Sequence, residues 1–149
     1  MTHEAASLSI TQINLVVHDV AASVDFYRRL GLVIEEARAL GWARHHATAI
    51  MTNSLRLEID SREFAAQWNP GLKGSAGCRG FVIFVTVPQR GMVDDLFEKM
   101  KSSGAPVQKL PEDAFWGARY AIIEDPDGNS VGIMSPIDQA KSFAPPSPP

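Results

Sequence analysis

The sequence is short of cysteine and of long apolar runs, and each shortage excludes a class of protein. A single cysteine among 149 residues allows no disulfide within the chain and no zinc site built on cysteine. No apolar run approaches the roughly 20 residues that a membrane-spanning helix needs. The first residues also lack the basic start and apolar stretch of a secretory signal. We therefore expect a soluble, cytoplasmic protein.

Charge of either sign is also not in large excess. Lys and Arg number 14 and Asp and Glu number 17, so the formal net charge is −3. This balance provides no electrostatic basis for a nucleic-acid partner or for an anionic membrane surface. A hydrophobic content of 45% at this length is typical of one folded domain with its own core. The composition excludes disorder of the whole chain, a collagen and a coiled coil.

An internal repeat of about 60 residues organises the chain. Apolar and polar residues alternate with the period of a half-buried strand, and two amphipathic segments end at Gly31 and Gly104. Asp19 is a plausible N-cap of the first helix. Each copy is predicted to be a βαβββ unit, with strands at residues 10–17, 32–38, 43–51 and 55–60 in the first and at 81–87, 105–109, 119–124 and 130–134 in the second.

The predicted domain occupies most of the chain. Residues 1–7 form a lead-in, and residues 8–136 form a single domain. Its first module covers about 8–60, its linker 61–79 and its second module about 80–136. Residues 137–149 are predicted to be a short helical fragment followed by a proline-rich tail.

Two motifs in this repeat resemble those of the vicinal oxygen chelate superfamily, which includes glyoxalase I, bleomycin resistance proteins and extradiol dioxygenases. They are DVAASVDFYRRLG at residues 19–31 and YAIIEDPDGNSV at residues 120–131. The resemblance covers roughly residues 8–136 and is nearest to bleomycin-resistance-like members. It implies an α+β fold in which two βαβββ modules form a curved eight-stranded sheet around a cavity, usually in a homodimer.

Metal-dependent members of that superfamily hold their ion with side chains from the first and last strands of each module. The resemblance places these four positions at Gln12, Glu58, Val82 and Gly132. Valine and glycine offer no ligand, and one carboxylate with one amide holds a divalent cation only weakly. We therefore expect neither a metal nor another cofactor, and a void at Val82 and Gly132.

The adjacent histidines His45 and His46 are the best candidates for a general base that titrates near neutral pH. Neighbouring residues of a strand point to opposite faces, so the two cannot chelate one ion together. One of them is expected to face the cavity, and the sequence leaves open which. A histidine that is only hydrogen-bonded or on the surface is the plainer alternative.

Strand parity predicts which side chains line the cavity. The mixture of apolar walls and a few polar anchors is typical of pockets for organic ligands. Aromatic rings could stack on a planar ligand, and an arginine could hold an acidic group. For Trp116, packing on the rim of the sheet is an equal alternative. The predicted ligand-binding residues are Asn14, Trp42, His46, Arg56, Glu58, Phe84, Trp116 and Arg119.

Two functions from different classes fit these residues. The first is a non-catalytic or metal-free binding protein, which sequesters a small organic, aromatic molecule as antibiotic-resistance members do. The alternative is a metal-dependent glyoxalase I-like lyase or isomerase that uses Gln12 and Glu58. A metal-free enzyme with His45, His46 or Glu58 as base is a third possibility, and a dioxygenase fits the ligand positions least. The two missing metal ligands favour the binding protein, because they remove the shared chemistry and leave the cavity.

Overall fold

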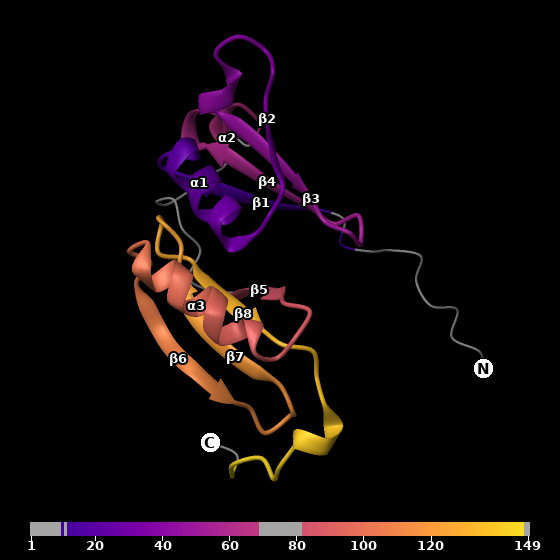
Figure 1. The fold of residues 1–149 in the computed structure, drawn as a ribbon. Coiled ribbons are helices and arrows are strands. Elements are labelled where there is room, and N and C mark those ends of the chain that lie inside the picture. The colour runs from indigo at the N-terminus through magenta and orange to yellow at the C-terminus, as the bar shows by residue number, and fades with distance from the viewer. Residues whose placement is uncertain (1–9, 11, 69–81, 148–149) are drawn as a thin grey trace, which may run out of the picture. The chain divides into compact units, whose positions relative to one another are not determined.

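The computed structural model describes residue 10 and residues 12–68 and 82–147. The chain divides into two compact units, of which the first ends at Ser75 and the second begins at Ala76. This division falls within the segment 61–79 that the sequence marks as a linker. Each unit contains one four-stranded sheet and its own helices (Figure 1).

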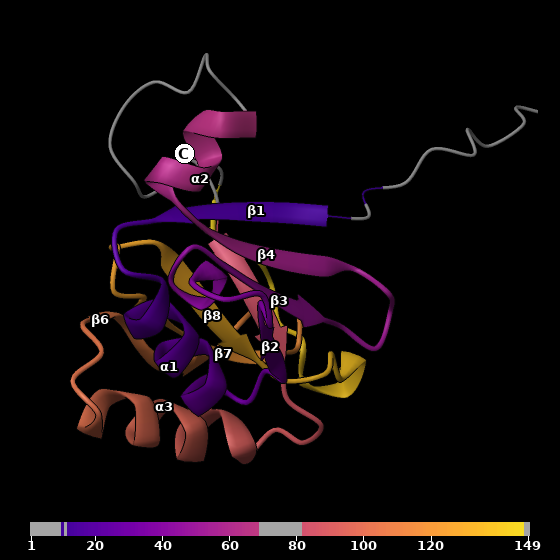
Figure 2. The same cartoon turned by 90° about the horizontal axis from the view of Figure 1, so that it is seen from above.

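The first unit carries a mixed sheet with the strand order β1-β4-β3-β2 (Figure 2). β1 and β4 are parallel, and the other neighbours are antiparallel. The first and last strands of the unit therefore lie side by side. Its elements are β1 (Gln12–Val17), α1 (Val20–Leu30), β2 (Ile34–Glu36), the 3-10 helix η1 (Trp42–Arg44), β3 (His46–Ile50), β4 (Arg56–Ser61) and α2 (Arg62–Trp68).

The second unit repeats this topology with the order β5-β8-β7-β6, in which β5 and β8 are parallel. The expected α+β class and the two βαβββ modules are thereby confirmed, and the eight strands form two sheets of four. The elements of this unit are β5 (Val82–Thr86), α3 (Met92–Ser102), β6 (Val107–Asp113), β7 (Arg119–Glu124), β8 (Ser130–Met134) and the 3-10 helix η2 (Gln139–Lys141).

Local signals explain why α1 begins and ends where it does. The Asp19 carboxylate accepts a hydrogen bond from the Ala22 amide at 3.1 Å, which caps the first turn. Gly31 takes the left-handed conformation with φ +114° and donates its N–H to the Arg28 carbonyl. Arg28 and Arg29 lie in the last turn, where the helix dipole favours positive charge. The predicted N-cap at Asp19 and the predicted helix end at Gly31 are confirmed.

Period-two alternation assigns opposite roles to the two faces of the first sheet. Leu15 and Val17 of β1 and Leu57 and Ile59 of β4 are buried with the apolar face of α1. The residues between them on both strands project from the other face of the sheet. That second face carries the polar groups of the candidate site.

The segment predicted as a strand at 43–51 begins instead with the 3-10 helix η1. Gly41 precedes it with φ +81°, and the His45 amide donates to the Trp42 carbonyl at 2.8 Å. β3 therefore starts at His46, and His45 lies outside the strand. The expectation that the two histidines are strand neighbours is wrong, because the turn at Gly41 delays the strand by several residues.

β6 lies further along the chain than the predicted 105–109. Pro106 lacks an N–H, and the strand begins after it at Val107. It then continues through Pro111 to Asp113 with two register shifts against β7. An edge strand tolerates proline, because one side of its backbone needs no partner within the sheet.

Smaller differences concern the ends of elements. The predicted strand at 32–38 shortens to β2, and the helical fragment expected after Pro136 is the single turn η2. In α3, Val93, Phe97 and Met100 form the buried stripe, and Met92 at the first position is 41% exposed. Within the described part of the chain, no helix has the length and apolar character needed to cross a membrane.

Candidate functional site

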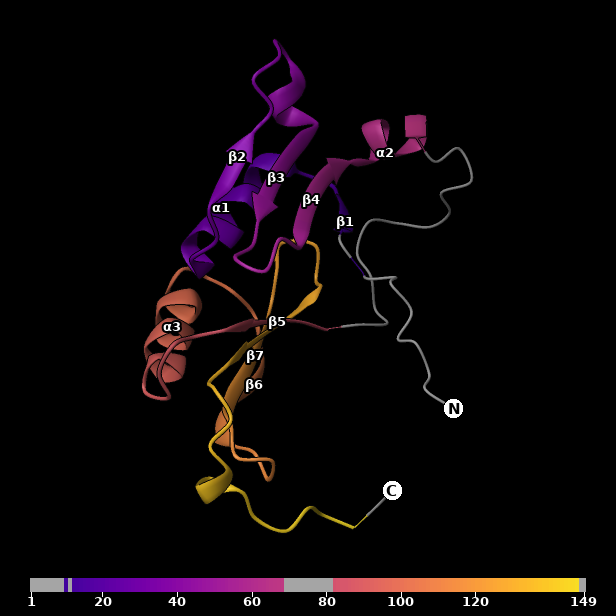
Figure 3. The same cartoon turned by 90° about the vertical axis from the view of Figure 1, so that its right-hand side faces the viewer.

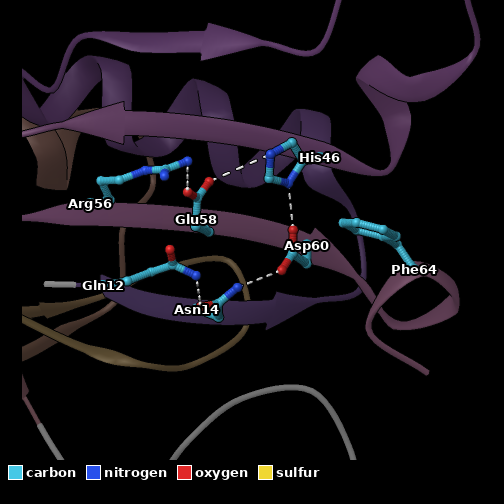
Figure 4. A pocket seen from close by; sticks show the side chains of 7 residues that line it. All are labelled: Gln12, Asn14, His46, Arg56, Glu58, Asp60 and Phe64. Carbon is cyan, nitrogen blue, oxygen red and sulfur yellow. Dashed lines mark hydrogen bonds and ion pairs between the residues drawn. The ribbon is translucent and has the colours of Figure 1, made fainter. Parts of the chain in front are cut away.

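A polar pocket lies on the face of the first sheet opposite α1. It has a volume of about 290 Å³ and combines side chains of β1, β3 and β4 with one ring from α2. The helix α2 directly follows β4 in the chain (Figure 3). Parallel pairing of β1 with β4 places Gln12 beside Arg56 and Asn14 beside Glu58. The lining residues are Gln12, Asn14, His46, Arg56, Glu58, Asp60 and Phe64 (Figure 4).

Asp60 is the buried centre of one half of the pocket, with a side chain 1% exposed. His46 donates from Nδ1 to Oδ1 at 2.6 Å, and Asn14 donates from Nδ2 to Oδ2 at 2.8 Å. Gln12 in turn donates to the Asn14 side-chain oxygen at 2.7 Å. Because a carboxylate only accepts hydrogen bonds, the contact with Asp60 requires a proton on His46 Nδ1. The other ring nitrogen, Nε2, faces Glu58.

Glu58 occupies the other half and is equally enclosed, with a side chain 3% exposed. Oε1 pairs with Arg56 Nη2 at 2.5 Å, and Oε2 accepts the Thr48 hydroxyl at 2.5 Å. His46 Nε2 lies 3.5 Å from Oε2. All four oxygens of the two buried carboxylates therefore already have protein partners, which offsets the cost of burying their charge.

An aromatic edge closes the end of the pocket beyond Asp60. The Phe64 ring meets the His46 ring edge to face, with centroids 5.6 Å apart. The Trp42 ring lies 4.9 Å behind Phe64 at an interplanar angle of 85°. The Phe64 amide donates to Ser61 Oγ at 3.1 Å, and His45 Nδ1 contacts the same hydroxyl at 2.8 Å. His46 is thus the histidine that lines the pocket.

The structure brings together five of the eight residues predicted to bind ligand. Asn14, His46, Arg56 and Glu58 line the pocket, and Trp42 supports its aromatic edge. The second unit holds the other three, namely Phe84, Trp116 and Arg119. The role of all eight in ligand binding stays a prediction.

In the second unit the predicted residues lie near Tyr120. The Trp116 ring is 5.2 Å from the Tyr120 ring, and the Phe84 ring is 6.5 Å from it. Arg119 is tied to two carboxylates: Nη2 donates to Asp94 Oδ1 at 2.6 Å and Nη1 to Asp113 Oδ1 at 3.1 Å. Arg119 is therefore engaged by carboxylates of its own unit.

Two residues that line the pocket, Asp60 and Phe64, are absent from the set predicted from the sequence. Asp60 follows Arg56 and Glu58 at the same period of two, so strand parity already carried that signal. The sequence contained no such signal for Phe64, because the turn from β4 into α2 decides where its ring lies.

The family is decided by comparison with known proteins. A model of the Glyoxalase/Bleomycin resistance protein/Dioxygenase superfamily matches residues 9–133. The chain belongs to this superfamily. The match is to the superfamily as a whole and names no subgroup within it.

Related sequences and structures agree with this assignment. The chain is 31% identical over 134 residues to the uncharacterized protein YraH of Bacillus subtilis, covering 85% of this chain and 97% of YraH. It is 29% identical over 127 residues to the uncharacterized protein Rv0887c of Mycobacterium tuberculosis, covering 83% and 72%. A glyoxalase-related enzyme from Fulvimarina pelagi has the same fold, with a TM-score of 0.72 at 17% identity over 86% of this chain and 88% of that one.

The residues at the superfamily's metal positions do not fit a metal in this member. Val82 presents a hydrocarbon, and Gly132 has no side chain. A Cβ built on Gly132 would overlap the Phe84 ring, so that ring fills the space where a ligand would project. The void expected at Gly132 is thus occupied by an aromatic side chain from the neighbouring strand.

The side chains at the two remaining metal positions, Gln12 and Glu58, are engaged by other groups of the protein. The Gln12 amide donates to Asn14, and both oxygens of Glu58 have partners. Among the residues that the structure describes, no three His, Cys, Asp or Glu side chains are grouped to hold an ion. His46, Glu58 and Asp60 bond to one another and to their neighbours instead of facing a common point.

The ion pair of Asp94 with Arg119 is expected to make the stability of the protein depend on pH in the acid range. The hydrogen bond from Arg119 holds the pKa of Asp94 below its ordinary value. A lowered folded-state pKa stabilises the fold above the unfolded pKa of about 3.9, and this stability is lost as pH falls through the folded value. Because the Asp94 side chain is 42% exposed, we expect Asp94→Asn to cost about 1 kcal/mol or less at pH 7.

The measurement is urea unfolding of both proteins between pH 7 and pH 2.5. The difference between wild type and Asp94→Asn should shrink as the pH falls below about 4. Asp95→Asn is the matched control, since it removes a charge from the same first turn of α3 without touching Arg119. An Asp94→Asn difference that is independent of pH would contradict the assignment.

Proposed function

We propose that this protein binds a small organic molecule in the pocket of its first unit and needs no resident metal to do so. One observation carries the proposal: both buried carboxylates are saturated by protein groups, while a guanidinium and an aromatic ring at the pocket surface stay accessible. Arg56 is 51% exposed, and Phe64 is half-buried. Such a surface suits an organic ligand with one polar and one apolar part.

The metal positions support the same proposal. Val82 and Gly132 supply no donor, and Glu58 is held by Arg56 and Thr48. A hard cation needs several free oxygen ligands, and among the described residues that line the pocket every carboxylate oxygen already has a partner. The glyoxalase I-like reaction through Gln12 and Glu58 is therefore less well supported than metal-free binding.

The test is binding of neutral aromatic fragments (indole, quinoline and benzamide) by the full chain with and without EDTA. We expect amide chemical shifts of Asn14, His46 and Phe64 to move during titration, and to move equally in EDTA. Elemental analysis of the purified protein should find no stoichiometric divalent ion. A tightly held ion at one per chain, or shifts confined to other residues, would overturn the proposal.

The implied homodimer and a role in antibiotic resistance stay predictions of the resemblance. Sedimentation of the purified chain tests the first. A growth assay in the presence of aromatic antibiotics tests the second.

A further inference from the structure

Building on the proposed function, we infer that the ligand is an aryl-substituted carboxylic acid, which places its carboxylate against Arg56 and its ring against Phe64. The inference names the class of ligand for the same pocket. Three features support this ligand class: the open edge of the Arg56 guanidinium, the position of the Phe64 ring, and the spacing of Glu58 and Asp60 along β4.

Among the lining residues of the pocket, the guanidinium of Arg56 is exposed, whereas both carboxylates are buried. Asp60 and Glu58 are 1% and 3% exposed, and each of their oxygens already accepts a hydrogen bond or an ion pair. A ligand amine would have to displace Arg56, His46 or Asn14 to reach them. A ligand that brings an acceptor avoids this competition.

Arg56 is the donor best placed to meet such an acceptor. Among the residues that the structure describes, its guanidinium has one partner, Glu58, which takes Nη2. The planar fork of arginine carries five N–H groups, so one edge remains for a bidentate carboxylate. Glu58 also holds the guanidinium in place, which reduces the entropy lost when the ligand binds.

Arg119 lacks this freedom. Its guanidinium already spans Asp94 and Asp113, so an incoming carboxylate would compete with two acids of the protein. Of the two arginines predicted to bind ligand, Arg56 is favoured as the acid anchor by its contacts.

The spacing of the pocket sets the length of the ligand. The Arg56 guanidinium lies beside Glu58, and the Phe64 ring lies beside His46, which pairs with Asp60 (Figure 4). Glu58 and Asp60 are two residues apart on β4, a separation of about 7 Å along a strand. The two anchors are at least this far apart, so a carboxylate and a ring need a chain of at least about three carbons between them. The volume of about 290 Å³ is at the lower end of ligand pockets, which fits a molecule of this size.

The experiment compares three probes of equal length by calorimetry: 4-phenylbutyrate, 4-phenylbutyramide and 4-phenylbutylamine. We expect the acid to bind about tenfold or more tightly than the amide, because a charge-assisted hydrogen bond replaces a neutral one. The amine is expected to bind most weakly. Phenylacetate should bind more weakly than 4-phenylbutyrate, because it cannot reach both anchors.

Two variants test which residue binds each end of the ligand. Arg56→Gln should remove the preference for acid over amide, whereas Arg29→Gln on the exposed face of α1 should leave it unchanged. Phe64→Leu should weaken acid and amide by the same factor. Circular dichroism of each variant confirms that it is folded before binding is measured.

The outcomes separate this inference from the proposed function. Equal or tighter binding of the amide or the amine overturns the acid class and leaves the pocket as a binding site. A preference for the acid that persists in Arg56→Gln also overturns it. Failure of all three probes to bind, together with failure of the neutral fragments, overturns both proposals.

Discussion

Asp60→Ala is expected to lower the free energy of unfolding by about 3 kcal/mol, because it leaves the partly buried donors of His46 and Asn14 without their acceptor. Asp60 is 1% exposed and accepts hydrogen bonds from His46 and Asn14, and Asn14 is itself held by Gln12. Removing the carboxylate therefore disorders the chain of side chains across β1, β3 and β4. Urea unfolding followed by circular dichroism measures the loss.

Asp60→Asn is the matched variant for this prediction. It keeps the volume and one carbonyl acceptor but loses the charge, so a loss of about 1.5–2 kcal/mol is expected. His46 is 28% exposed and can recover part of its hydrogen bonding from water, which places both values toward the lower end for buried ion pairs. Equal stability of wild type and Asp60→Ala would show that Asp60 does not satisfy these donors.

Gly117→Ala is expected to destabilise the protein by about 3–4 kcal/mol. Gly117 has φ +96°, and a Cβ there would overlap the Asp138 carbonyl oxygen. The Gly117 carbonyl also accepts hydrogen bonds from the Asp138 amide and from Arg90 Nη1, each at 3.1 Å. An alanine must therefore push the segment around Asp138 away and break these bonds, in addition to adopting a strained backbone.

Gly41→Ala separates the two causes. Gly41 has φ +81°, and nothing lies within 4 Å of a Cβ built on it. Only the backbone strain remains, so a loss of about 1 kcal/mol is expected. Thermal or urea unfolding of both variants provides the comparison. If the two substitutions cost the same, steric overlap with Asp138 contributes nothing.

Strand parity predicted much of the candidate site. The alternation of residues 55–60 placed Arg56 and Glu58 on one face, and that of residues 10–17 placed Asn14 on the same side of the sheet. Asp60 obeys the same period and could have been included. Which of His45 and His46 faces the pocket could be decided only from the structure. The 3-10 turn after Gly41 places His46 in β3 and leaves His45 outside it.

Contacts between distant residues were beyond the reach of the sequence. Arg119 was predicted to bind ligand, and the sequence does not show that it pairs with Asp94, 25 positions earlier. Gly132 suggested a void, and the ring of Phe84 from the neighbouring strand fills it. Neither contact follows from spacing along the chain, since each depends on how one element packs against another.

The sequence by itself determined the βαβββ repeat, the ends of α1 and the polar face of β4. Periodicity, capping and backbone freedom act over a few neighbouring residues, so they can be read along the chain. Only the tertiary structure decided that Asp60 and Phe64 complete the pocket and that Arg56 keeps an open edge while Arg119 does not. Hydrogen-bond partners and ring contacts depend on three-dimensional distance, which parallel pairing and helix packing set and local sequence does not.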